Sequence, residues 1–180
     1  VSGTMTSSGK TGERTTTFTG SSVELTEGAE QSTIQLGGKI SVTSNLSGPS
    51  GQKVTFTGNK GSVVMSPLQE SSNQPLRSLT LSGGTTIVLT EVQTSKDGKK
   101  NPIRVNAKGD GLTYTVGADG TAVVVLTGNV EFDGEDSQLI GNTKCQAATV
   151  YLNEKGEVAK VVFKGAGRSE IKEKKLEDKG

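Results

Sequence analysis

The chain has no histidine and no tryptophan, and it contains a single cysteine, Cys145. One cysteine cannot close a disulfide within the chain, and without a Cys/His cluster the sequence offers no zinc site. The lack of histidine also removes the commonest general base of enzymes and leaves Cys145 without a partner for nucleophilic catalysis. We therefore expect no catalytic residues, no metal and no cofactor.

The net charge is close to zero, and large side chains are few. The 20 Lys and Arg residues almost balance 19 Asp and Glu residues, which leaves a net charge of +1. This balance argues against a nucleic-acid partner, because such partners are drawn by strongly basic surfaces. No apolar run approaches the roughly 20 residues of a membrane-spanning helix. The hydrophobic residues make up only 30% of 180, with 4 Phe and 2 Tyr against 25 Gly, which predicts one thin, elongated or hollow domain.

The chain is rich in apolar residues that alternate with polar ones. From Thr121 to Phe132 the even positions are apolar or glycine, which is the period of a half-buried β-strand. Abundant Thr and Val agree with strands, so we predict an all-β fold. The residues expected to face inward are Ile34, Leu36, Ile40, Val42, Leu79, Leu81, Ile87, Leu89, Val124, Leu126, Val130, Phe132, Val150 and Leu152.

Glycine recurs in the middle of these alternating segments. The unit reads FTGSSVEL, IQLGGKISV, LTLSGGTTIVL and VLTGNVEF, with a looser copy TFTGNKGSVVM. Because glycine weakens a strand, its repeated placement predicts sharp corners at which long strands cross from one sheet to another. The alternative is that each glycine ends a strand before a hairpin. The expected corners are Gly20, where a change of parity suggests a bulge, and Gly38, Gly58, Gly83 and Gly128.

Turn signals between the units are spaced as in a sandwich or jelly roll. We expect a flexible Ser/Thr/Gly-rich start over residues 1–16, a single jelly-roll domain over 17–167, and a charged tail over 168–180 that is solvated or forms a short helix. Leu68 to Gln74 is expected to be a surface loop. The chain begins without a basic and then apolar leader, so any secretion signal is expected to have been removed already.

Short motifs for nucleotides and cations fail on spacing. Gly9-Lys10-Thr11 ends like a phosphate-binding loop, but the preceding glycine is one residue too far away and no apolar strand comes before it. Gly165-Ala166-Gly167 lacks the third glycine of a dinucleotide fingerprint. Acidic residues at 133–136 lack the spacing of a calcium loop, and no pair of carboxylates is singled out for glycoside cleavage.

The segment VVVLTGNVEFDGEDSQLIGN, residues 123–142, resembles the signature strand pair of the periplasmic lipopolysaccharide-transport bridge proteins, the OstA-like family. The shared elements are the Leu-Thr-Gly-Asn corner at 126–129, an alternating strand, a short acidic turn, and a Gly-Asn corner at 141–142. Residues 148–152 and 158–163 match the following family strands. Upstream, the lead-in of the family is matched by Asn101-Pro102, Gly109, Gly111 and Tyr114.

The resemblance implies an OstA-like open β-jelly roll, shaped like a half-open taco, with a further corner at Gly141. It implies a periplasmic protein whose interior groove, lined by the inward-facing residues above, holds the acyl chains of lipopolysaccharide or a related lipid. The implied protein partners are other jelly-roll transport proteins, or copies of the same chain, stacked edge to edge. Two alternatives stay open: the inward residues simply fill a closed core, or the protein is an extracellular adhesin or carbohydrate-binding β-sandwich with aromatic platforms.

Overall fold

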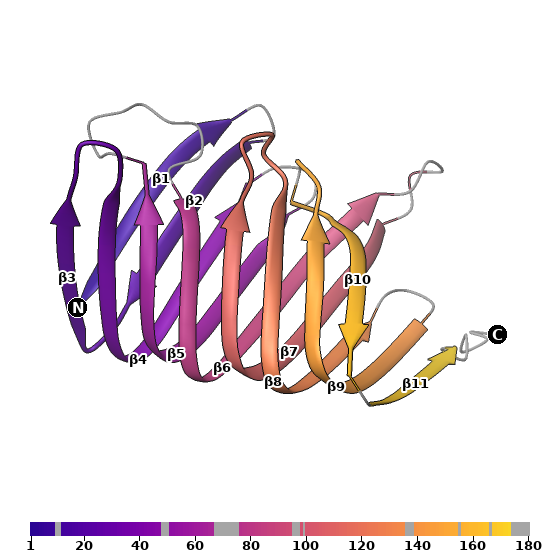
Figure 1. Ribbon diagram of the computed structural model, residues 1–180. Helices are drawn as coiled ribbons and strands as arrows, with labels where there is room; N and C mark the ends of the chain where they lie inside the picture. The colour runs from indigo at the N-terminus through magenta and orange to yellow at the C-terminus, as the bar shows by residue number, and fades with distance from the viewer. Residues whose placement is uncertain are drawn as a thin grey trace.

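The computed structural model describes residues 1–9, 12–47, 51–66, 76–94, 98, 100–135, 139–154, 156–165 and 167–173. Within these residues the chain forms β-strands and no helix (Figure 1). The strands are β1 (Ser2–Gly9), β2 (Gly12–Thr19), β3 (Ser22–Glu27), β4 (Ser32–Leu46), β5 (Lys53–Met65), β6 (Leu76–Thr94), β7 (Lys100–Val116), β8 (Ala122–Glu135), β9 (Leu139–Leu152), β10 (Val158–Lys164) and β11 (Arg168–Glu173).

All of these strands belong to one antiparallel sheet of 11 strands that is folded over on itself. The order is β1-β2-β4-β5-β6-β7-β8-β9-β10, with β3 also paired to β4 and β11 also paired to β9. The long strands β4 to β9 therefore contribute to two walls, and each wall has its own short edge strands. The fold is an all-β, open jelly roll of long bent strands that does not close into a barrel.

We call the two halves of the folded sheet wall A and wall B. Wall A consists of β3, β10 and the segments 32–37, 60–65, 76–82, 111–116, 122–127 and 147–152. Wall B consists of β1, β2, β11 and the segments 40–46, 53–58, 85–94, 100–109, 130–135 and 139–145. Figure 1 shows the walls lying face to face and joined along the bends at the bottom of the view. We call the opposite margin, where the walls are joined by no strand, the mouth.

The bends coincide with shifts in strand register. Gly38, Gly83 and Gly128 lie in such shifts and have φ angles of 74°, 81° and 72°, a left-handed conformation that glycine adopts without strain. Gly58 adjoins the shift in β5. The strands continue on both sides of each bend, so these glycines mark corners and not hairpin ends. The bend of β7, at Gly109 and Asp110, was not marked in the sequence analysis.

The corner predicted at Gly141 is wrong. Gly141 pairs with Gly134 on one side and with Ile171 on the other, in unbroken register within wall B. The bend of β9 lies instead at Gln146, between the pairs formed by Cys145 and Ala147. A glycine motif could not reveal this corner, because the bending residue carries a side chain.

At Gly20 the chain crosses from wall B to wall A, but the strand is interrupted. β2 ends at Thr19 and β3 begins at Ser22. The Ser21 backbone N–H donates to the carbonyl oxygen of Gly37 at 2.8 Å, which holds the crossing against the corner of β4. Gly20 thus separates two short strands, β2 in wall B and β3 in wall A, which correspond to the two halves of a long strand such as β4.

The first residues are part of the sheet, which corrects the expectation of a flexible start over 1–16. β1 pairs with β2 along its whole length, from Ser2 opposite Thr19 to Gly9 opposite Gly12. Gly3 makes room for the buried ring of Phe18, because a Cβ on Gly3 would lie 2.4 Å from Phe18 Cε2. Backbone pairing and one aromatic side chain therefore order a segment whose composition alone suggested fraying.

The charged end also departs from expectation. Residues 168–173, expected to be solvated or helical, form β11, which pairs with β9 from Arg168 opposite Lys144 to Glu173 opposite Leu139. Strand pairing with a long neighbour satisfies the backbone without an apolar surface. Residues 174–180 and the loop expected at 68–74 lie outside the described residues.

Candidate lipid-binding interior

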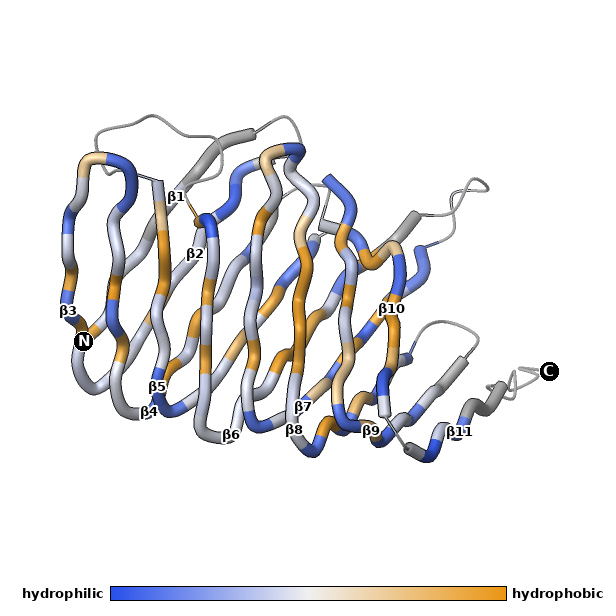
Figure 2. The backbone as a smooth tube through the Cα atoms, viewed as in Figure 1, coloured by the Kyte–Doolittle hydropathy of each residue, from blue (hydrophilic) through white to orange (hydrophobic). Residues whose placement is uncertain are grey.

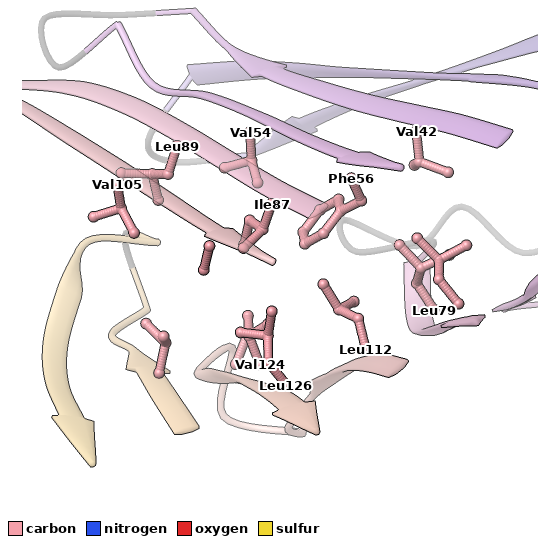
Figure 3. Packing of buried hydrophobic residues seen from close by; sticks show 14 of the residues in the cluster. Val42, Val54, Phe56, Leu79, Ile87, Leu89, Val105, Leu112, Val124 and Leu126 are labelled. Atoms are coloured by element: carbon pink, nitrogen blue, oxygen red, sulfur yellow. The ribbon is translucent and has the colours of Figure 1, made fainter. Parts of the chain in front are cut away.

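The inward-facing residues named from the sequence all lie between the two walls. They belong to one cluster of buried hydrophobic side chains, with exposed fractions from 0% at Leu79, Val124 and Leu126 to 8% at Leu152. Figure 2 shows the apolar positions recurring along β4 to β9 with polar positions between them. In Figure 3, the side chains that point toward one another across the interior include Val42, Val54, Phe56, Ile87 and Leu89 from wall B and Leu112, Val124 and Leu126 from wall A.

The protein's own side chains fill this space. Residues exposed by 8% or less are out of reach of water, so of the thin, elongated or hollow forms expected from the low bulk, the hollow one does not apply to the described part of the chain. Two facing sheets about 10 Å apart need only one medium-sized side chain from each wall to meet in the middle. Val, Leu and Ile supply that volume without many aromatic rings. In this conformation the residues form a core, which is one of the alternatives left open by the sequence.

The apolar interior extends to both ends of the sheet. On β3, Leu25 pairs with buried Ile34 and is 48% exposed. On β10, Phe163 pairs with buried Ala148 and is 40% exposed, with its ring 5.2 Å from that of Phe132. The described residues add no strand beyond β1 and β3 at one end or beyond β10 and β11 at the other. Apolar side chains on the inner face therefore remain uncovered at both ends.

At the mouth, wall B carries polar residues at inward positions. The alternation of Ile87 and Leu89 along β6 continues to Glu91, which is only 2% exposed. Gln52, just before β5, is 4% exposed. Its Nε2 donates to Glu91 Oε2 at 3.4 Å and also to the carbonyl oxygen of Gly156, in the turn between β9 and β10. Gln52 thus connects the two walls across the mouth.

A second polar group lies beside these residues on β2 and β4. Arg14 Nη1 donates to Ser44 Oγ at 3.1 Å, and the hydroxyl of buried Thr16 donates to the same oxygen at 3.2 Å. Burial raises the pKa of the Tyr114 phenol above its usual range, and the positive charge of Arg14 partly offsets this rise. We call Arg14, Thr16, Ser44, Gln52 and Glu91 the mouth cluster.

Sequence reasoning missed the mouth cluster, although one signal was available. Glu91 stands two residues after Leu89, and Gln52 two residues before Val54, so strand parity places both side chains inside. The run of apolar inward residues ends at Leu89 on one strand and begins at Val54 on the other, so a pattern of apolar positions does not include Glu91 or Gln52. The connection between Gln52 and Gly156 spans 104 positions in the chain and cannot be read from local pattern.

The described residues provide little for other chemistry. No group of three or more His, Cys, Asp or Glu side chains within them is placed to hold a metal ion. Cys145 is buried, and its thiol donates to the carbonyl oxygen of Ala147 at 3.2 Å, as an ordinary strand residue would. These residues also contain no apolar helix long enough to cross a membrane.

A shallow, open hollow of about 440 Å³ lies over wall A. The hollow extends across the four neighbouring strands β3, β4, β5 and β6. Its lining includes Glu24, Gln35 and Lys60, together with Leu36 and Leu81. Of the residues predicted to line the groove, only Leu36 and Leu81 belong to the lining of this hollow, so it is not the groove that the resemblance implies.

The outer face of wall B carries a row of alternating charges. Glu131 lies between Lys108 Nζ at 2.6 Å and Lys144 Nζ at 2.9 Å. Hydrogen bonds from these two ammonium groups lower the pKa of the Glu131 carboxyl from 4.5 to about 2. A depressed folded-state pKa stabilises the fold above the unfolded value and loses that contribution as pH falls from about 4.5 to about 2.

We therefore expect Glu131 to remain ionised in acid. A carboxyl-resolved NMR titration should place its midpoint near pH 2, and the double replacement of Lys108 and Lys144 by Met should raise it toward 4.5. Lys39→Met, at the exposed corner of β4, should leave the Glu131 titration unchanged. An ordinary Glu131 pKa in the unaltered protein would show that these ion pairs do not form in solution.

Comparison with known proteins gave no matching family model, no matching curated protein and no matching solved structure. The likeness of residues 123–142 to the OstA-like family therefore stands as a resemblance.

Proposed function

We propose that the protein shields the acyl chains of lipopolysaccharide or a related lipid between its two walls, as one module of a periplasmic bridge. The observation that carries this proposal is the uninterrupted apolar interior, which ends at both edges of the sheet in exposed inward-facing side chains, Leu25 and Phe163. Uncovered apolar side chains at both ends of one continuous interior favour a module whose interior continues into a neighbouring module.

An acyl chain would enter as the walls move apart about the glycine corners. Burying a methylene is worth about 0.8 kcal/mol, so a chain of a dozen carbons gains on the order of 10 kcal/mol at most. The side chains that separate from one another would contact the lipid instead, so apolar contacts are exchanged and not lost. Such an opening must break the hydrogen bond from Gln52 to Gly156 and separate the rings of Phe56 and Tyr114, whose centroids lie 5.6 Å apart.

The edge strands support assembly into a bridge. β1 and β3 at one end, and β10 and β11 at the other, each have one described neighbour, so their outer backbone groups are available for strand addition. If the β10 edge of one module pairs with the β3 edge of the next, Phe163 and Leu25 come together and the apolar interior continues between modules. Unlike edges joined in this way form a head-to-tail contact, which extends into an open filament where the rotation between modules does not close a ring.

Native mass spectrometry of the protein purified without detergent from the periplasm of a diderm bacterium tests the proposal. We expect a fraction of the molecules to carry an additional mass equal to that of a lipid, and an apolar competitor to remove it. Folded protein that is wholly free of lipid in this preparation would contradict the proposal.

Carbohydrate binding is a second candidate, and one observation favours it. The ring of Tyr151 is 41% exposed on the outer face of wall A, with Lys160 Nζ at 5.9 Å from its centroid. Exposed aromatic rings are the platforms on which sugars stack. Glycan binding that is lost in Tyr151→Ala, by protein that carries no lipid, would support this alternative.

A further inference from the structure

Glu91 has one carboxylate oxygen with no role in the contacts described so far. The side chain is 2% exposed, and Gln52 bonds to Oε2, while Oε1 has no hydrogen-bond partner. Glu91 also makes no ion pair with any described residue. A buried polar atom without a partner is costly and rare in folded proteins, and a buried negative charge without a partner is more costly still.

The neighbouring donors of the mouth cluster do not reach Glu91 Oε1. Gln52 Nε2 uses its two N–H groups on Glu91 and Gly156, and Arg14, which donates from Nη1 to Ser44, has no described contact with Glu91 although its other N–H groups remain. Next to Glu91 across the sheet stands Ile103, which offers no side-chain donor. Within the described part of the chain, Glu91 Oε1 therefore lacks a hydrogen-bond donor, and a cationic donor would also balance the charge of the carboxylate.

We propose that Glu91 Oε1 binds the ammonium group of an amine-bearing lipid head group at the mouth. The inference rests on the proposed function, because an acyl chain between the walls is what brings a head group to this margin. A primary ammonium fits better than a hydroxyl because it supplies both the N–H and the positive charge. Gln52 would act as a positioning residue, since its bond to Oε2 orients the carboxylate with Oε1 free.

Two amphiphiles with the same chain and charge test this site in the full-length protein. Dodecylammonium has N–H donors, whereas dodecyltrimethylammonium has none. Measured by calorimetry below their micellar concentrations, dodecylammonium should bind about tenfold more tightly, as expected for one charge-assisted hydrogen bond. Glu91→Gln should remove the difference, while the matched change Glu24→Gln, at an exposed position on β3, should preserve it.

The outcomes separate this inference from the proposed function. Equal affinities for the two amphiphiles, or a preference that survives in a folded Glu91→Gln protein, would overturn the Glu91 site while leaving acyl-chain binding intact. Failure of both amphiphiles to bind would overturn the proposed function as well. The comparison of the two amphiphiles in the unaltered protein needs no variant, so it remains decisive if Glu91→Gln does not fold.

Discussion

Leu126→Ala is expected to lower the free energy of unfolding by about 2–5 kcal/mol. Leu126 is 0% exposed and lies in the middle of wall A, opposite Leu112 on β7 and Ala148 on β9. Removing its side chain loses apolar burial and leaves a cavity that the neighbouring strands can only partly close. Because a domain of this kind has a free energy of unfolding of about 5–15 kcal/mol, the loss caused by Leu126→Ala is a large fraction of the total. Chemical denaturation gives the value directly.

Leu25→Ala is the matched control, since it removes the same atoms from a leucine that is 48% exposed on edge strand β3. We expect it to change stability by about 0.5 kcal/mol or less, as is usual at exposed positions. If both variants lose the same free energy of unfolding, the interior is not tightly filled, and the open interior groove implied by the resemblance exists in solution.

Gly128→Ala is expected to cost about 1–3 kcal/mol, because this corner of β8 requires a conformation that alanine resists. Gly128 has a φ of 72°, and a Cβ there would lie 2.3 Å from Asp110 Oδ2 and 2.9 Å from Asp110 Cβ. Asp110 is held at this corner by a hydrogen bond of 3.0 Å from Asn129. The free energy of unfolding is again the quantity to measure.

Gly134→Ala separates the effect of the corner from that of glycine replacement in general. Gly134 lies on the same strand, has no positive φ, and a Cβ there would meet only Phe132 Cε1 at an ordinary 3.5 Å. We expect this variant to be neutral or slightly stabilised. Adding Asp110→Ala to Gly128→Ala should recover the part of the loss caused by the clash. An unchanged stability of Gly128→Ala would contradict the conclusion that this corner requires glycine.

The alternation of apolar and polar residues was enough to predict which side chains face the interior. Alternation at Val124, Leu126, Val130 and Phe132 was visible because glycine at 128 leaves parity unchanged. The same pattern could not say whether these side chains meet across the interior or leave it empty. That depends on how closely the two walls approach, which is set by contacts between residues far apart in sequence.

The features that escaped prediction have physical reasons of the same kind. Gln146 bends β9 because its neighbours on β8 shift register at Gly128, so the signal for this corner lies on another strand. β1 and β11 are ordered by backbone pairing, which composition does not report. Glu91 was missed because a carboxylate at an inward position contradicts the apolar rule on which the reading relied.

The central claim is that lipid occupies the space inside the walls, and site-specific crosslinking from Phe163 tests it most directly. Phe163 and Tyr151 are both aromatic, are 40% and 41% exposed, and lie on the paired strands β10 and β9, but only Phe163 faces inward. With benzoylphenylalanine at either position in a diderm host, irradiation should yield a lipopolysaccharide adduct at 163 and none at 151. Folded protein that forms no adduct at 163, or equal adducts at both positions, would contradict the account.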